Sequence, residues 1–299
     1  MADYIHKSVL LKEMVESLEI QSGDTVVDCT LNSGGHSEYI LEHHKKANVI
    51  GIDADSDAIK KAKVRLAKFG DRVQIFKSNF RNLDKVLDKA KMKEVDGFMF
   101  DLGWSSDQIE VSGRGFTFQK DEPLQMAYDS DEKEVTAETV VNEWSEETLR
   151  DILKGFGEEQ FSGRIARAIV EAREVEPIKT TVQLREIVWN AVPGFTRNKK
   201  IHPATKTFQS IRIAVNDEFG ALQEGLKKAF ERVKVGRRIA VISFHSLEDR
   251  IVKHWAKGLV SEEKAILINK KPIIAGEEEL KENPRARSAK LRIIQKTSN

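Results

Sequence analysis

Two short apolar runs that each end in an aspartate, with a glycine turn between them, constrain this chain most. Residues 25–28 form the first run and residues 49–53 the second, and the turn closes with Gly34 and Gly35. This order predicts a strand, a turn, a helix and a second strand, the unit that holds adenosine-containing cofactors. Glycines let the backbone approach a ligand closely. Asp53 lies 19 residues after Gly34, so its carboxylate is expected to accept hydrogen bonds from both ribose hydroxyls.

Strand and helix patterns alternate through the first hundred residues. The predicted strands are 25–28, 49–53, 73–77 and 97–101, separated by helices near 37–44, 56–68 and 83–90. Such alternation predicts a parallel sheet with helices on both faces. The pattern stops after Asp101, turns helical, and returns with a strand at 238–244. We therefore predict one discontinuous α/β domain of residues 1–105 and 206–299, interrupted by a mostly helical insertion at 106–205.

Composition excludes several classes of protein. The chain has 299 residues, 32% of them charged, and a formal net charge of +1, which is typical of a globular protein. Its one cysteine, Cys29, precludes an internal disulfide and fits a reducing compartment. No apolar run approaches the roughly 18 residues of a membrane span. We expect a cytoplasmic location and no membrane partner. Without HxxxH or CxxC spacing, we expect no metal site either.

The turn distinguishes two classes of cofactor. A nicotinamide dinucleotide needs spaced glycines for its pyrophosphate, whereas this turn reads DCTLNSGG. Asp28, at the tip of the first strand, would repel a pyrophosphate but suits a ligand with an amino group and a sulfonium. The pattern therefore favours S-adenosylmethionine over a dinucleotide. The alternative is a glycine turn that only joins a strand to a helix.

Two further residues follow predicted strands. Asp101 ends the strand at 97–101, and ligands of open α/β sheets bind beyond the carboxyl ends of the strands. Its carboxylate is a candidate to orient the cofactor's amino group or to accept a hydrogen bond from a nucleophilic amine, and the alternative is an ordinary turn aspartate. Phe80 follows the strand at 73–77 and is a candidate to cover an adenine, or else a core phenylalanine.

Long motifs occur in one order along the chain: HKSVLLKEMVESL, GGHS, DLGWSS, RGFTF, FGEEQFSGRIARAIV, HPATKTFQSIRIAVNDE, SFHSLEDRIVK and NPRARSAKLR. Together they resemble the bacterial 16S ribosomal RNA cytosine-N4 methyltransferase family, also called MraW or RsmH, from His6 to about Lys296. The resemblance implies a class I, Rossmann-like S-adenosylmethionine-dependent methyltransferase sheet with a helical substrate-recognition insertion. It also implies methylation of the N4 amine of a cytidine in the decoding region of 16S rRNA, with the small ribosomal subunit as partner.

The same resemblance implies a set of cofactor-binding residues: Gly34, Gly35, His36, Asp53, Phe80, Asp101 and Gln108. The roles of His36 and Gln108 come from the resemblance alone. Asp101 is also the candidate catalytic residue, as the acceptor for the reacting amine. Two stretches depart from the family pattern. Cys29 and Asn32 stand where glycines are usual, and residues 122–128 carry Glu122, Gln125, Ala127 and Tyr128 in place of Gly, Asp, Arg and Met.

Two kinds of residue in the sequence are candidates to contact a substrate. Aromatic residues near the predicted mouth are candidates to stack on a base or to be local core: Trp104, Phe116 and Phe118. Basic residues are candidates to hold an RNA backbone or to be solvated surface: Arg164, Arg167, Lys199, Lys200, Lys206 and Arg212. Three alternatives to the rRNA enzyme stay open, namely a nicotinamide-dependent dehydrogenase, a non-catalytic assembly factor, and a methyltransferase for DNA or another RNA. A homodimer is possible.

Overall fold

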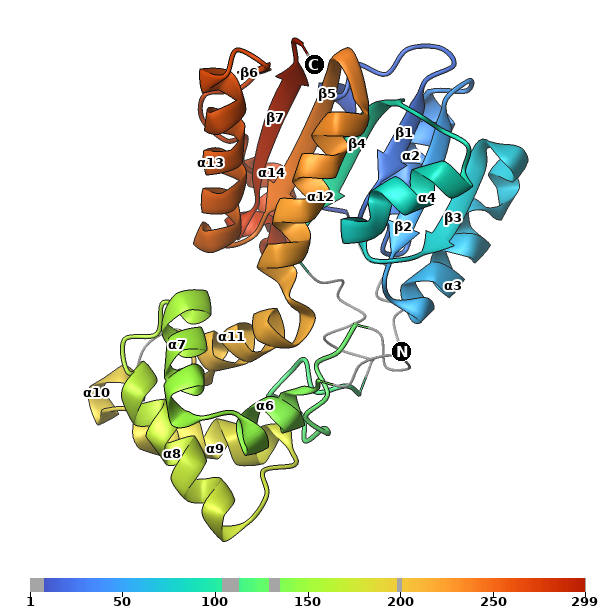
Figure 1. The fold of residues 1–299 in the computed structure, drawn as a ribbon. Coiled ribbons are helices and arrows are strands. Elements are labelled where there is room, and N and C mark those ends of the chain that lie inside the picture. Colours follow the sequence, from blue (N-terminus) through green and yellow to red (C-terminus); the bar gives the residue numbers. More distant parts are fainter. Residues whose placement is uncertain (1–7, 104–112, 129–134, 198–200, 299) are drawn as a thin grey trace. The chain divides into compact units, whose positions relative to one another are not determined.

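The chain folds into two compact units in its computed structural model, which describes residues 8–103, 113–128, 135–197 and 201–298. One unit comprises Met1–Gly103 and Phe219–Asn299, and the other comprises Trp104–Glu218 (Figure 1). Each unit has its own hydrophobic core. Among the described residues, no helix is both long and apolar enough to span a membrane.

The first unit is built on one seven-stranded sheet in the order β3-β2-β1-β4-β5-β7-β6. Its strands are β1 Thr25–Asp28, β2 Asn48–Asp53, β3 Val73–Lys77, β4 Val95–Asp101, β5 Val233–Ser243, β6 Ala265–Leu267 and β7 Lys290–Lys296. The five strands β1 to β5 run parallel, and β7 pairs antiparallel with both β5 and β6. The predicted α/β class is confirmed.

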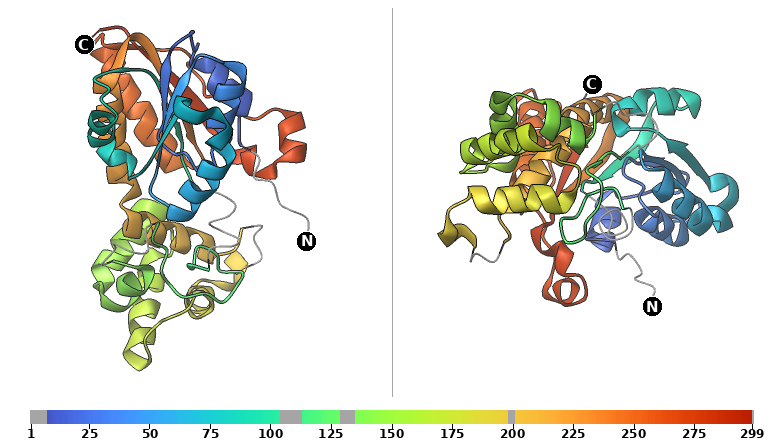
Figure 2. Two further views of the ribbon diagram at one scale, coloured as in Figure 1. Left: turned by 90° about the vertical axis from the view of Figure 1, so that its right-hand side faces the viewer. Right: turned by 90° about the horizontal axis from the view of Figure 1, so that it is seen from below.

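Helices cover both faces of this sheet (Figure 2). They are α1 Leu11–Ser17, α2 Gly35–His43, α3 Ser56–Leu66, α4 Leu83–Lys89, α12 Glu218–Arg232, α13 Ser246–Ser261 and α14 Glu277–Glu282, with short 3-10 segments at Ala67–Arg72, Phe80–Asn82 and Pro284–Ser288. Neighbouring residues of a strand serve opposite faces, as the two-residue period requires. Val26 packs with α1, α2 and α3, whereas Val27 packs with α4, α12 and α13.

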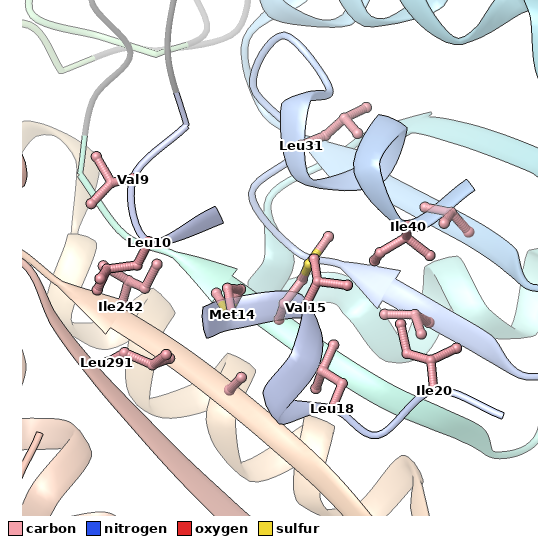
Figure 3. Packing of buried hydrophobic residues seen from close by; sticks show 14 of the residues in the cluster. Val9, Leu10, Met14, Val15, Leu18, Ile20, Leu31, Ile40, Ile242 and Leu291 are labelled. Atoms are coloured by element: carbon pink, nitrogen blue, oxygen red, sulfur yellow. The ribbon is translucent and has the colours of Figure 1, made fainter. Parts of the chain in front are cut away.

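The lead-in helix α1 closes one of these faces. Met14 lies within the helix, Leu10 and Leu18 lie directly before and after it, and all three are buried. Figure 3 shows these residues packed over the sheet, with Ile242 of β5 and Leu291 of β7 among their neighbours. Packing of α1 fixes the position of the preceding segment, which reaches the candidate site.

The second unit is helical. Its helices are α6 Ala137–Glu143, α7 Glu146–Gly157, α8 Ser162–Val175, α9 Thr181–Ala191, α10 Gly194–Arg197 and α11 Ala204–Asn216. The side chains of Thr136, Ser145 and Thr180 cap the first backbone N–H groups of α6, α7 and α9. Helix α11 packs against α7, α6 and α9, and the predicted return to the α/β domain at residue 206 lies inside it.

The unusual segment at 122–128 is tied into the second unit by its own side chains. Glu122 is buried, and its carboxylate accepts the backbone N–H of Gly115 at 2.9 Å. The Tyr128 hydroxyl donates to Glu218 at 2.9 Å. Glu122 and Tyr128 therefore have structural partners here.

Replacing Phe98 tests the sheet core. Phe98 is buried in the middle of β4, so Phe98→Ala should lower the free energy of unfolding by about 3 to 5 kcal/mol, because it leaves a cavity between β4 and the helices. Urea unfolding followed by circular dichroism measures the change. Val64→Ala is the matched control, since Val64 is 81% exposed and its loss should change stability by less than about 0.5 kcal/mol. Equal effects of the two variants would contradict the assigned core.

Candidate active site

Three aspartates meet at one edge of the sheet. Asp28 ends β1, Asp53 ends β2 and Asp101 ends β4. Strand β1 lies between the other two, with Asp28 opposite Gly51 of β2 and Met99 of β4. Because the three strands are parallel neighbours, their carboxyl ends lie side by side, where open α/β sheets bind ligands. We call Asp28, Asp53 and Asp101 the acid cluster.

The turn after β1 adopts a shape that only some residues allow. Asn32 and Gly34 have positive φ angles of 49° and 83°. Asn tolerates this left-handed conformation, so Asn32 fits where the family usually has glycine. An added Cβ at Gly35 would lie 2.1 Å from the Ser8 hydroxyl oxygen, so a side chain at this position would require Ser8 to move. The turn is thus held close to the segment that precedes α1.

Asp53 joins this turn to β2. Its Oδ2 accepts the Asn32 N–H at 2.7 Å, and its Oδ1 accepts the Asp55 N–H at 2.8 Å. Burial raises the pKa of Asp53 to about 6 despite these two bonds. Each carboxylate oxygen can accept more than one hydrogen bond, so the residue retains capacity for the hydroxyls of a ribose.

Asp28 is more deeply buried. The Ser37 hydroxyl of α2 donates to its Oδ2 at 2.6 Å, and the Thr30 N–H donates to its Oδ1 at 3.3 Å. Burial raises the pKa of Asp28 to about 7, with the Asp53 charge adding to the effect. Asp28 therefore shapes the turn and adds negative charge that a bound cation would stabilise.

Asp101 differs from the other two acids in its hydrogen bonds. Its backbone N–H donates to the Thr30 hydroxyl at 2.6 Å, but its Oδ1 is buried and has no hydrogen-bond partner among the described residues. Burial, followed by the charges of Asp28 and Glu248, raises the pKa of Asp101 well above its usual range. A buried carboxyl oxygen without a donor is a ready acceptor for an amine or an ammonium group.

The other predicted cofactor-binding residues take different places. His36 is buried at the start of α2, with Nδ1 at 3.7 Å from Asp101 Oδ2. Phe80 opens the 3-10 segment after β3 and packs edge-on against Phe100 with 5.6 Å between ring centroids. It is only partly buried in the core, so both of its predicted roles are compatible with this place. Gln108 lies outside the described residues.

Sequence reasoning missed Glu248. This buried residue sits in the first turn of α13, and its Oε2 accepts the backbone N–H groups of Phe244 and His245 at 2.8 and 3.2 Å. The sequence pattern that could have indicated Glu248 is a capping box, in which His245 is followed three residues later by Glu248. The neighbouring Asp249 forms an ion pair with Arg292, with Oδ1 to Nε at 2.7 Å.

The residues predicted to contact a substrate differ in their exposure. Phe116 is buried in the core of the second unit, and Arg212 is buried against Glu218 with Nε to Oε1 at 2.6 Å, so neither faces a substrate. Phe118 is half-buried between His202 and Phe208. Arg164 and Arg167 are exposed on α8. Trp104, Lys199 and Lys200 lie outside the described residues.

The chemistry of the acid cluster fits S-adenosylmethionine. This cofactor carries a ribose, an amino group and a positively charged sulfonium. Asp53 retains acceptor capacity for hydroxyls, and Asp101 Oδ1 is an orphaned acceptor for N–H groups. Positive charge next to buried acids favours their ionised forms and so relieves the cost of their burial. Within the described part of the chain, no group of three His, Cys, Asp or Glu side chains is arranged to hold a metal ion.

Comparison with known proteins identifies the family. The model of the MraW methylase family matches residues 3–297. A protein of Sulfurihydrogenibium sp. named Ribosomal RNA small subunit methyltransferase H is 46% identical over 96% of this chain and 98% of its own length. A protein of the same name from Symbiobacterium thermophilum is 44% identical over 97% of this chain and 96% of its own length.

Among solved structures, an rRNA methylase from Streptococcus thermophilus matches over 98% of this chain and 98% of its own, with 12% identity and a TM-score of 0.46. The family match and the two relatives cover nearly the whole chain. The chain belongs to the MraW methylase family.

Proposed function

We propose that this protein transfers a methyl group from S-adenosylmethionine to the N4 amine of a cytidine in the decoding region of 16S rRNA. The observation that carries the proposal is the buried Oδ1 of Asp101 within the acid cluster, which has no hydrogen-bond partner among the described residues. The substrate class is supported by relatives named as small-subunit rRNA methyltransferases. The N4 position and the decoding region rest on the motif resemblance. The partner is the small ribosomal subunit, in the cytoplasm.

The reaction asks the protein to activate a poor nucleophile, because the N4 lone pair is delocalised into the cytosine ring. The cofactor supplies a methyl carbon made electrophilic by its sulfonium charge. Nitrogen gains a bond to this carbon while the carbon–sulfur bond breaks, and its electron pair stays on sulfur. Holding the reactants in line contributes about 7 to 11 kcal/mol in favourable systems. Asp101 Oδ1 then accepts the proton that the amine loses.

Access to the base is the second requirement. A cytidine within folded RNA must leave its stack before its amine can react, at a cost of a few kcal/mol. Phosphate contacts by exposed cations hold the RNA backbone in a salt-dependent manner. We assign this role to the second unit, which carries the exposed Arg164 and Arg167 on α8. The second unit is then the substrate-recognition insertion that the sequence predicts.

Methyl transfer tests the proposal directly. We expect small subunits that lack the modification to acquire label from S-adenosylmethionine labelled in its methyl group, at a single cytidine identified by nuclease digestion and mass spectrometry. Asp101→Asn should slow transfer by roughly 100- to 10,000-fold, the usual range for loss of an acid–base group. Binding of S-adenosylhomocysteine, measured by calorimetry, checks that the variant still folds.

Asp151→Asn is the matched control, because this aspartate is exposed on α7 and should leave transfer unchanged. Tight cofactor binding without label transfer would favour a non-catalytic assembly role, and label in DNA or in another RNA would contradict the substrate. Full activity of Asp101→Asn would remove the assigned role of Asp101.

Cofactor affinity should depend on pH. Because burial raises the pKa of Asp28 to about 7 and that of Asp53 to about 6, both acids become protonated as the pH falls through these values. A cationic ligand requires their ionised forms, so affinity for S-adenosylmethionine should rise from about pH 5.5 to about pH 8, by at most roughly tenfold per pH unit for each proton released. Calorimetric titration at several pH values measures this affinity. S-adenosylhomocysteine lacks the sulfonium charge and should respond less; equal responses would contradict the electrostatic account.

A further inference from the structure

We propose that a pocket at the opposite end of the sheet from the acid cluster binds a small aromatic anion. The pocket has a volume of about 360 Å³, which is in the range of small-molecule sites. Helices α12 and α13, which cover the same face of the sheet, contribute its apolar wall (Figure 1). The apolar wall consists of Phe230, Trp255 and Leu259. Most of the other lining residues are lysines, namely Lys227, Lys264 and Lys296.

The pairing of the strands separates this pocket from the acid cluster. Lys296 is the last residue of β7, and its ammonium group donates to the carbonyl oxygen of Val233 at 3.0 Å. Val233 begins β5 and pairs with Val95, the first residue of β4, whereas Asp101 is the last residue of β4. Seven residues of extended strand span about 20 Å, so a ligand here does not share the cofactor site. The inference is therefore independent of the proposed function.

Two aromatic side chains give the pocket a surface for a planar ring. Phe230 of α12 and Trp255 of α13 pack edge to face, with 6.3 Å between ring centroids and 86° between ring planes. Phe230 is buried in the core, whereas Trp255 is half-buried, as is Leu259 one turn later on the same helix. Aromatic rings pack well against such side chains in offset or edge-on arrangements. The wall thus favours a flat apolar ring as one part of the ligand.

Lys296 supplies the charged part of the site. It is only 3% exposed, and its ammonium group lies 5.3 Å from the centroid of the Phe230 ring. An ammonium group has three N–H donors, and the described residues give it one hydrogen-bond acceptor, the Val233 carbonyl. Burial lowers the pKa of Lys296, although the charges of Glu94 and Glu231 act in the opposite direction. The nearby acids therefore do not fully compensate the buried cation, and a bound anion would stabilise it.

The remaining charges at the pocket are compatible with an anion. Lys227 is exposed on α12 and forms no ion pair with a described residue. Lys264 lies directly before β6 and forms an ion pair with Glu262 at 3.0 Å, so its charge is partly neutralised. Glu231 is exposed and is the one acid in the lining. Three lysines against one glutamate favour a ligand that carries a carboxylate or a phosphate group.

Indole NMR of the full-length chain tests the inference. The chain has four tryptophans, and Trp255→Phe identifies the Trp255 signal in ¹⁵N-tryptophan-labelled protein. Two probes carry the two kinds of anion: indole-3-acetate has a carboxylate and adenosine monophosphate has a phosphate. We expect at least one of them to shift the Trp255 signal in a saturable manner. Their uncharged counterparts, 3-methylindole and adenosine, should bind roughly tenfold or more weakly, because they lack the group that pairs with Lys296. The anion that binds more tightly identifies the charged group of the ligand.

Variants of the pocket separate binding from folding. Lys296→Met nearly keeps the length of the side chain but removes the ammonium group, so it should weaken binding of the anion by roughly tenfold or more. Leu259→Trp fills the pocket from a half-buried position and should abolish binding, which covers the case in which Lys296→Met disturbs the fold. Lys257→Met is the matched control, because Lys257 is exposed on α13 outside the pocket and its loss should leave binding unchanged.

Three outcomes would overturn the inference. The first is a Trp255 signal that neither anion shifts, the second is equal affinity for charged and uncharged probes, and the third is full binding by Lys296→Met. Normal binding at this pocket together with no methyl transfer would instead count against the proposed function alone.

Discussion

Burial of carboxylates at adjoining strand ends is the constraint on which the first unit depends. Unpaired charge is costly to remove from water, so each acid needs donors or must take up a proton. Asp53 receives two backbone N–H groups from the turn and from the start of α3, and Asp28 receives the Ser37 hydroxyl. Asp101 alone has an oxygen without a described donor. Within the described residues, the carboxylates of Asp28 and Asp53 therefore have hydrogen-bond donors, whereas the buried Asp101 oxygen that a substrate or cofactor would contact has none.

The sequence predicted those parts of the site that local patterns determine. Asp28, Asp53 and Asp101 were placed correctly at strand ends because each closes a short apolar run. Glu248 was missed because its place near Asp101 depends on the pairing of β4 with β5, strands separated by the whole second unit. His36 Nε2 lies 3.1 Å from the Val9 carbonyl oxygen. This contact was missed for a similar reason, since it depends on how α1 packs on the sheet.

Runs of charged residues predicted exposure less well than apolar spacing predicted the strands. Arg212 belongs to a basic stretch, yet it shares the buried side of α11 with Phe208 and Val215, at helical spacings of four and three residues. That periodicity was a better predictor of its burial than the local charge. The segment at 122–128 similarly uses Glu122 and Tyr128 for hydrogen bonds within the second unit. The role of Gln108 and a homodimer stay predictions.

A crystal structure of the protein with S-adenosylhomocysteine would show whether the acid cluster holds the cofactor. We expect the ligand beyond the carboxyl ends of β1, β2 and β4, with the ribose hydroxyls on Asp53 and the sulfur nearer to Asp101. A ligand bound elsewhere, or an acid cluster closed by protein side chains while the ligand is bound, would contradict it.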